Sequence, residues 1–181
     1  MKPPKCADYI FGKMTKRPWR TKATVKQGSG IFKATKSGQC VSVDQIESTE
    51  DGFVAQLKGK LTRRRYKYAT IFVDHYSDLS YVHLQSTLTS DETLQAKHAF
   101  EAYARSMEVK ILRYHADNGR FADNMFINDV EIQGQSISYC GVGAHFQNGR
   151  AEKRIRDLRE KARIMLLHAS SRWSEAISVH L

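Results

Sequence analysis

Alternating apolar and polar positions predict several short β-strands in the middle of the chain. Residues 40–46 alternate in this way, and Asp44 falls near the end of the run. Two further β-rich runs, 68–74 and 81–84, are separated by a short polar turn and favour an antiparallel pair. Residues 47–60 show no such alternation, and we expect a loop or a poorly formed hairpin there.

Helical spacing of apolar positions predicts two long helices. Thr89 and Glu92 have the spacing of a capping box, so a helix is expected over about 90–107. Asn148 can cap a second helix that runs to about residue 167. Its apolar stripe consists of Ala151, Ile155, Leu158, Ala162 and Leu166.

The segment between these helices supplies the remaining elements. A β-rich run over 109–115 is followed by Asp117-Asn118-Gly119, which favours a tight turn because Asn and Gly tolerate positive φ. A weaker helix over 121–131 and a short strand over 136–139 come next. This order predicts a mixed α/β fold, in which ligand-binding residues gather at strand ends and helix starts.

Positive charge is concentrated at the N-terminal end of the chain. The formal net charge is +10, and residues 1–39 hold ten Lys and Arg residues against one acidic residue, Asp8. Several Pro and Gly residues interrupt this segment, which we expect to be an extended basic arm. Such an arm favours binding to a polyanion such as nucleic acid, although many basic tails are only solvated.

Composition excludes several classes of protein. With 41% hydrophobic residues in 181 positions, the chain can form one globular domain with a core. The sequence contains no apolar run of transmembrane length and no signal-peptide pattern, so we expect an intracellular protein without membrane contact. The cysteines at 6, 40 and 140 are odd in number and widely spaced, which argues against a disulfide framework.

Three acidic residues occupy the predicted strand ends and helix start: Asp44, Asp117 and Glu152. Carboxylates brought together in this way could hold two divalent ions, which activate a water or hydroxyl and stabilise the leaving oxygen in phosphodiester cleavage. The structural alternative is that Asp117 only forms a turn and Asp44 only ends a strand. Each acid taken singly favours that alternative, so the hypothesis depends on the combination.

One face of the last helix carries Glu152 and a line of arginines at Arg156, Arg159 and Arg163. A phosphate backbone could lie along this line. The alternative, that Glu152 and Arg156 form an ordinary surface ion pair and the arginines face solvent, has about even weight from spacing alone.

Three segments resemble the copia-type integrases of long-terminal-repeat retrotransposons, which belong to the retroviral integrase superfamily. VSVDQIES is similar to the strand of the first aspartate, RYHADNGRF to the block of the second, and HFQNGRAEKRIRDLREKARIML to the glutamate helix. Glu152 follows Asp117 by 35 positions, close to the spacing typical of these enzymes. The resemblance covers about residues 5–178.

The resemblance implies a ribonuclease-H-like fold, with a mixed five-stranded sheet flanked by helices. It implies a polynucleotidyl transferase that trims DNA ends and joins them to target DNA, with Asp44, Asp117 and Glu152 as catalytic ligands of Mg²⁺ or Mn²⁺. The loop 140–148 would shape the site. By position, the residues expected to contact nucleic acid are Asn148, Lys153, Arg156 and Arg159.

The chain departs from the family pattern near its N-terminus. The family's upstream zinc module ends in a Cys-x-x-Cys pair, which would align with Cys6 and Tyr9, so one ligand is replaced. We therefore expect residues 1–38 to be a degenerate remnant of that module and 39–181 to be the catalytic core, truncated at its C-terminal end. Asp74 matches a structural strand position of the family rather than the first catalytic aspartate.

The sequence leaves rival functions open. A catalytically inactive nucleic-acid-binding relic of a transposable element would keep the basic arm and cut nothing. Another ribonuclease-H-like nuclease, acting on RNA or DNA junctions, would share the metal chemistry. For an integrase we expect DNA partners (element ends and target), a homo-oligomer at full length, and a location in the nucleus or a cytoplasmic virus-like particle.

Overall fold

The computed structural model of the chain describes Tyr9 and residues 33–53, 56–57, 60–61, 64–140 and 148–172. Two compact units are distinguished. Residues 32–154 form the unit that holds the five-stranded sheet, and the chain from Ile155 onward belongs to the other. The basic arm expected over 1–38 lies almost entirely outside the described residues.

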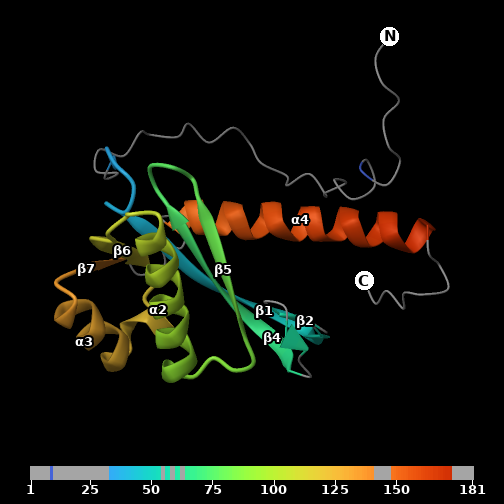
Figure 1. Ribbon diagram of the computed structural model, residues 1–181, viewed down its shortest axis with the longest axis horizontal. Coiled ribbons are helices and arrows are strands. Elements are labelled where there is room, and N and C mark those ends of the chain that lie inside the picture. Colours follow the sequence, from blue (N-terminus) through green and yellow to red (C-terminus); the bar gives the residue numbers. More distant parts are fainter. Residues whose placement is uncertain are drawn as a thin grey trace, which may run out of the picture. The chain divides into compact units, whose positions relative to one another are not determined.

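A mixed five-stranded sheet is the framework of the first unit (Figure 1). The strands are ordered β5-β4-β1-β6-β7. Antiparallel pairing joins β4 to β1 and to β5, whereas β1, β6 and β7 pair in parallel. The strands are β1 (Val41–Phe53), β4 (Arg65–Asp74), β5 (Ser80–Gln85), β6 (Arg113–Ala116) and β7 (Ser136–Tyr139). The five-stranded mixed sheet predicted from the sequence is confirmed.

The first strand is longer than the apolar alternation indicated. β1 continues through Phe53, with an irregular register against β4 between Glu47 and Gly52. Two short antiparallel strands of two residues each follow, β2 (Gln56–Leu57) and β3 (Lys60–Leu61). The loop expected over 47–60 is therefore wrong for 47–53, whereas the alternative of a poorly formed hairpin agrees with the short β2–β3 pair. Backbone hydrogen bonding to β4 extends this strand, and such pairing needs no alternation of side chains.

Helix α2 (Ser90–Ser106) has the predicted bounds within one residue. The Thr89 hydroxyl accepts a hydrogen bond from the Glu92 backbone N–H at 3.4 Å, which is half of the expected capping box. The Glu92 carboxylate instead accepts from the backbone N–H groups of Ser86 and Thr87, both at 2.9 Å. The acid therefore fixes the turn before the helix rather than the helix's own first residue.

Three further helical elements complete the described chain: η1 (Arg120–Ala122), α3 (Asn124–Ile132) and α4 (Gly149–Arg172). Within α4, burial is confined to the beginning of the predicted apolar stripe. Ala151 is fully buried and Ile155 is 8% exposed, whereas Leu166 is 43% exposed. None of the described helices has the length and apolar run that crossing a membrane requires.

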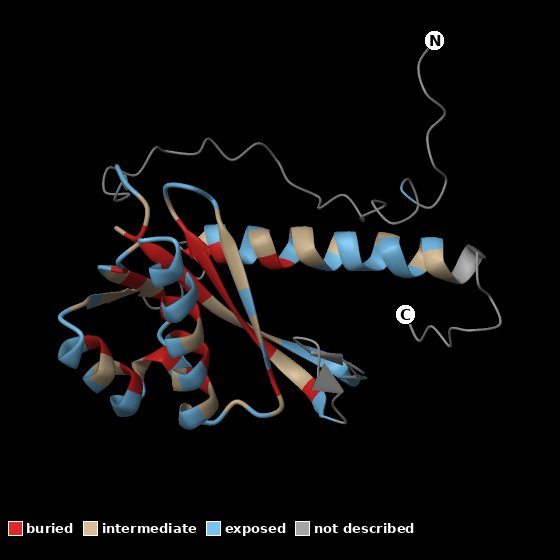
Figure 2. Ribbon diagram, in the orientation of Figure 1, coloured by how far each residue is buried: buried red, intermediate tan, exposed pale blue. Residues whose placement is uncertain are grey.

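The hydrophobic core lies on the face of the sheet that α2 and α3 cover (Figure 2). Val41 and Val43 of β1 point to this face, together with Phe72 of β4 and Tyr114 of β6. The Phe72 ring stacks on Phe100 of α2, with centroids 4.5 Å apart. Because side chains alternate along a strand, Ser42 and Asp44 face the opposite side of the sheet.

A buried charged network ties α2 to α3 beneath this core. Lys97 is fully buried, and its ammonium lies 2.8 Å from Glu101 and 2.6 Å from Asp129. Glu101 also accepts hydrogen bonds from the Tyr114 hydroxyl and the Gln135 amide, both at 2.7 Å. Burial alone would raise the pKa of Glu101, but the hydrogen bonds from Lys97, Gln135 and Tyr114 outweigh it and lower the pKa.

Candidate active site

The parallel register of β1 and β6 brings the two aspartates side by side. Val41 pairs with Tyr114 and Ser42 with His115. The same register, continued by two residues beyond the paired positions, would align Asp44 with Asp117, the first residue after β6. Neighbouring strands lie about 4.8 Å apart, and paired residues place their side chains on the same face. Residues 73 positions apart in the chain thus become neighbours.

A third position joins this row from β7. Ala116 pairs with Tyr139, so the next pair is Asp117 and Cys140. The Cys140 backbone N–H donates to the Ala116 carbonyl at 2.9 Å, which holds this pairing beyond the strand end. Asp117 and Cys140 directly follow the carboxyl ends of β6 and β7, whereas Asp44 lies near the beginning of the longer strand β1. We call these three residues the acidic row.

Glu152 reaches the same end of the sheet from the first turn of α4. Asn148, directly before the helix, is 2% exposed and donates from its side-chain nitrogen to the Val43 carbonyl at 3.0 Å. Arg150 donates to the His75 carbonyl at 2.9 Å, and Arg154 to the Asp78 carbonyl at 2.8 Å. The start of α4 is thus hydrogen-bonded to β1 and to the β4–β5 turn.

All three acids act electrostatically on one buried thiol. Burial raises the pKa of Cys140, and the negative charges of Asp117, Glu152 and Asp44 raise it further, in that order. The three carboxylates therefore lie within electrostatic range of Cys140. Over residues 33–53, 64–140 and 148–169, no three His, Cys, Asp or Glu side chains lie close enough to hold a metal ion as they stand.

The carboxylates of Asp44, Asp117 and Glu152 have the oxygen donors that a hard divalent cation prefers. Mg²⁺ and Mn²⁺ prefer carboxylate oxygens, and like charges held near one another are relieved when a cation neutralises them. Asp44 and Asp117 are half-buried, and Glu152 is exposed. We infer that Glu152 must shift to share an ion with the two aspartates.

The role of Gly119 in the turn after Asp117 differs from the one predicted from the sequence. Gly119 has φ −90°, so the left-handed conformation that Asn-Gly was expected to supply is not used. A Cβ at Gly119 would instead lie 3.2 Å from the Asp117 carboxylate. Any larger residue at this position would therefore crowd that carboxylate and force it to shift.

Solved structures provide the comparison for this arrangement. No protein-family model matches the sequence, and neither does any curated protein. A chain of the simian T-cell lymphotropic virus intasome, solved with the PP2A regulatory subunit B56 gamma, matches with TM-score 0.60 and 13% identity. The match covers 82% of this chain and 47% of the other, so this chain spans about half the length of that relative.

Two catalytic cores of retroviral integrases also match, each with a TM-score below 0.5. The catalytic core of BIV integrase matches with TM-score 0.48 and 15% identity, over 78% of this chain and 87% of that one. The HTLV-2 integrase core in complex with magnesium, in its dimeric form, matches with TM-score 0.41 and 21% identity, over 56% and 60%. We base the assignment of a ribonuclease-H-like α/β fold on the intasome chain, because only its TM-score exceeds 0.5 among these three.

The residues expected to contact nucleic acid differ in exposure. Lys153, Arg156 and Arg159 are exposed on α4. Asn148 is buried, and its amide nitrogen is bonded to the Val43 carbonyl, so no exposed surface of this side chain is available for nucleic acid. Its place in the structure is that of a residue that positions the start of α4.

Asp74 has the structural role expected for it. The carboxylate is 4% exposed and accepts from the Gly38 backbone N–H at 2.9 Å. It also accepts from the backbone N–H and the hydroxyl of Ser77, at 2.8 and 2.7 Å. These bonds confirm that Asp74 stabilises the β4–β5 turn. Cys6 and residues 141–147, most of the loop expected to shape the site, lie outside the described residues.

Sequence reasoning did not single out Cys140 or His115. Both lie on the face of the acidic row, and the Cys140 sulfur is 3.6 Å from the His115 Nε2 atom. Nearby on β1, the Ser42 hydroxyl lies 2.7 Å from the Nε2 atom of His75, which directly follows β4. The available signal was the two-residue spacing of His115 and Asp117 on a strand, which places both on one face.

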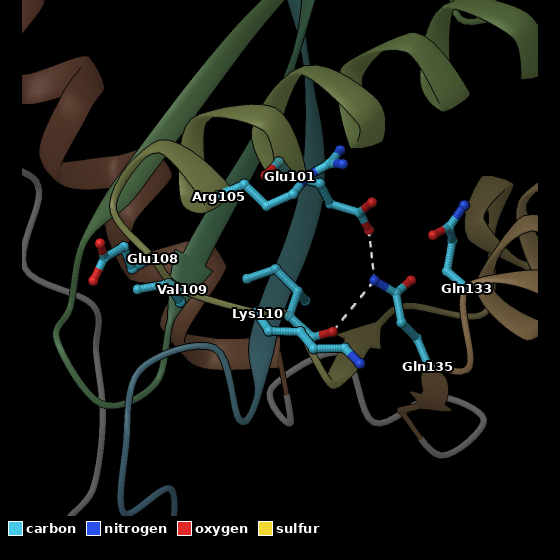
Figure 3. A pocket seen from close by; sticks show the side chains of 8 residues that line it. Glu101, Arg105, Glu108, Val109, Lys110, Gln133 and Gln135 are labelled. Atoms are coloured by element: carbon cyan, nitrogen blue, oxygen red, sulfur yellow. Dashed lines mark hydrogen bonds between the residues drawn. The ribbon is translucent and has the colours of Figure 1, made fainter.

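A pocket of about 360 Å³ lies away from the acidic row (Figure 3). Lys110 and Ile111 precede β6 and Gln135 precedes β7, so the pocket is at the opposite end of these strands from Asp117 and Cys140. Glu101 and Arg105 of α2 form another wall. The Gln135 amide donates to Glu101, as the dashed line in Figure 3 marks. This pocket has no part in the candidate active site.

Proposed function

We propose that this chain is the catalytic core of a copia-type retrotransposon integrase, a divalent-metal-dependent polynucleotidyl transferase that processes 3′ ends and transfers DNA strands. One observation carries the proposal. The register of β1 and β6, continued by two residues, would align Asp44 with Asp117, and the charges of Glu152 and both aspartates raise the pKa of the same thiol. The likeness in fold to an intasome chain is consistent with this function.

In this proposal Asp44, Asp117 and Glu152 hold Mg²⁺ or Mn²⁺ in a two-metal site. When bound, these ions supply Lewis-acid stabilisation of the attacking and leaving oxygens. Asp44 lies on β1 and Asp117 directly follows β6, and these two aspartates form the part of the site that the sheet holds. Glu152 sits on a helix start that Asn148 and Arg150 anchor through side-chain hydrogen bonds.

The proposed substrate is DNA, both element ends and target. Lys153, Arg156 and Arg159 are exposed cationic side chains on the helix that carries Glu152, and we assign them to phosphate contacts. The basic N-terminal arm would add contacts that do not depend on sequence. The full-length protein would act as a homo-oligomer in the nucleus or in a cytoplasmic virus-like particle.

The decisive experiment compares metal-dependent nicking and strand transfer on oligonucleotides. Asp44→Asn, Asp117→Asn and Glu152→Gln keep side-chain shape but remove the charge, and each should reduce activity to background. Asp51→Asn and Glu131→Gln are matched controls, because both acids are exposed and lie outside the acidic row. Full activity in the Asp117→Asn and Glu152→Gln variants would overturn the assignment.

The second candidate is an inactive nucleic-acid-binding relic. The observation in its favour is that the described side chains do not form a ready-made metal cluster. Calorimetric titration with Mn²⁺ separates the two functions. An integrase core should give a heat signal when Mn²⁺ binds, and Asp117→Asn should abolish that signal. A relic should bind DNA but give no heat signal with Mn²⁺.

A further inference from the structure

The pocket of Figure 3 is a second candidate binding site, remote from the acidic row. Its volume of about 360 Å³ lies within the range of small-molecule sites. The walls come from the end of α2, from the segment that leads into β6 and from the residues before β7. All of these belong to the unit that holds the five-stranded sheet, so the shape of the pocket depends on that unit alone.

A buried carboxylate is the strongest binding group of this pocket. Glu101 is 8% exposed, and the Lys97 ammonium, the Tyr114 hydroxyl and the Gln135 amide all lie at its Oε1 atom, at 2.8, 2.7 and 2.7 Å. Burial raises the pKa of Glu101, but these hydrogen bonds lower it overall, so the carboxylate is charged at neutral pH. Over the described part of the chain, no group donates a hydrogen bond to Oε2. This second oxygen is therefore available to a cationic N–H donor.

The Gln135 side chain holds another acceptor without a partner. Its amide nitrogen donates to Glu101 at 2.7 Å and to the Ile111 carbonyl at 3.3 Å, as the dashed lines in Figure 3 mark. Both partners are acceptors, so the hydrogen bonds fix which end of the amide is the nitrogen. The amide oxygen is buried and has no hydrogen-bond partner among the described residues. An N–H donor that entered the pocket could pair with this oxygen and relieve its desolvation penalty.

The residue that ends α2 adds a further negative charge to the pocket. Glu108 has φ +59°, in the left-handed region that favours glycine. Its backbone N–H donates to the Arg105 carbonyl at 2.9 Å, and the Val109 N–H donates to the Ala104 carbonyl at 3.0 Å, which closes the end of the helix. Glycine would relax this conformation, whereas the glutamate side chain lines the pocket and supplies a carboxylate there.

These acceptors suit a guanidinium group. A guanidinium has five N–H donors in one plane and is more weakly hydrated than an ammonium, so it is well suited to a partly buried site with several acceptors. Val109 and Ile111 also line the pocket and can pack along the methylene stem of such a ligand. Arg105 and Lys110 are exposed lining residues, and their positive charges suit a carboxylate on the same ligand. The pocket thus combines groups for both ends of an arginine.

We propose that this pocket binds arginine with a free carboxylate, either as the amino acid or as the last residue of a protein chain. Glu101 and Glu108 hold the guanidinium, and Arg105 and Lys110 hold the carboxylate. The site does not depend on the proposed DNA-joining activity, because it lies at the opposite end of β6 and β7 from Asp117.

Amide NMR titration of the isotope-labelled full chain tests the site. Free L-arginine and the tripeptide Gly-Gly-Arg with a free carboxyl end are the two probes, and at least one should shift the backbone signals of residues 108–111 in a saturable way. Tighter binding of L-arginine assigns the site to the amino acid, and tighter binding of the tripeptide assigns it to a chain end. L-Citrulline replaces the guanidinium by a neutral urea, and amidated Gly-Gly-Arg lacks the carboxylate. Each control should bind at least about fivefold more weakly than its parent probe.

Three variants ask which acids hold the guanidinium. Glu101→Gln should weaken binding by about tenfold or more, with circular dichroism confirming that the fold is kept. Glu108→Gln also serves if Glu101→Gln does not fold, and should weaken binding by about twofold to fivefold because this acid is exposed. Glu131→Gln is the matched control, since that exposed acid of α3 does not line the pocket. Absence of saturable shifts with both probes, equal affinity for citrulline, or unchanged affinity in a folded Glu101→Gln or Glu108→Gln variant would overturn the proposal.

Discussion

The side-chain nitrogen of Asn148 donates a hydrogen bond to the carbonyl oxygen of Val43, the residue before Asp44, at 3.0 Å. This one bond joins the helix of Glu152 to the strand of Asp44 across 105 positions of the chain. Both groups are buried, so water cannot readily replace either partner in this hydrogen bond. The relative placement of the two acids therefore depends on a residue that itself carries no charge.

Asn148→Ala should lower both stability and metal-dependent activity. The Val43 carbonyl would be left buried without this partner, which costs about 1–3 kcal/mol of unfolding free energy. Urea denaturation followed by circular dichroism measures the loss. Asn128→Ala, at an exposed position of α3, is the control and should change stability by less than about 0.5 kcal/mol. Equal effects of the two substitutions would contradict a role for Asn148 in joining α4 to β1.

Lys97→Met should destabilise the fold strongly. The change leaves the carboxylates of Glu101 and Asp129 in the interior without their cation, which costs about 3–5 kcal/mol. A shift of the urea midpoint reports this cost, and Lys161→Met, at an exposed position of α4, should cause little change. Adding Glu101→Gln and Asp129→Asn to Lys97→Met should restore part of the stability. No recovery in the triple variant would argue that packing, rather than unpaired charge, causes the loss.

His75 should make the fold sensitive to mild acid. Burial, the charge of Arg150 and the neighbouring His115 lower the pKa of His75 from 6.5 to about 4. Between these values the unfolded chain binds a proton that the folded chain does not, so stability is fully present above pH 6.5 and falls as the pH drops toward 4.

Thermal unfolding from pH 7 to 4 checks this dependence on His75. The midpoint temperature should fall with pH in the parent protein and fall less steeply in His75→Gln. His168→Gln is the control, because that residue is exposed on α4, and it should keep the parent slope. Parallel curves for the parent and His75→Gln would show that other groups account for acid sensitivity.

Gly119→Ala and Gly134→Ala should lower different quantities, metal affinity in the first variant and folding stability in the second. At Gly119 a new Cβ would lie 3.2 Å from the Asp117 carboxylate and displace it, so metal affinity should fall. At Gly134 a Cβ has open space but φ is +63°, so stability should fall by about 1–2 kcal/mol with metal affinity unchanged. Calorimetric titration with Mn²⁺ and urea denaturation measure the two quantities. If both variants lose only stability, the role given to Gly119 is wrong.

Lys153→Ala should weaken DNA binding in a salt-dependent way. Loss of one phosphate contact lowers the slope of log affinity against log salt by about 1, with little change in sequence preference. Fluorescence anisotropy over a range of salt concentrations measures the slope. Lys110→Ala is the matched control, because this lysine lies in the pocket at the other end of β6. An equal change of slope in both variants would point to a diffuse charge effect instead of a contact by α4.

The sequence by itself determined the elements whose signal is local. The strand over 136–139 and the helix after Thr89 were predicted because strand propensity and capping spacing act over a few neighbouring residues. The structural role of Asp74 was expected from the family resemblance instead. The extension of β1 to Phe53 was missed, since the hydrogen bonds that define it come from β4. The exposure of Leu166 was missed because helical periodicity gives a face and not the partner that covers it.

The candidate acids were nominated from the sequence, but only the tertiary structure made them neighbours. Strand register decides that Asp44 lies beside Asp117 and that Cys140 completes the row, and register is set by pairing between segments far apart in the chain. The same long-range packing buried Asn148, which had been predicted from its sequence position to contact DNA. It also brought His115 within 3.6 Å of Cys140. Residue chemistry is local, whereas the distance between two side chains is a property of the folded chain.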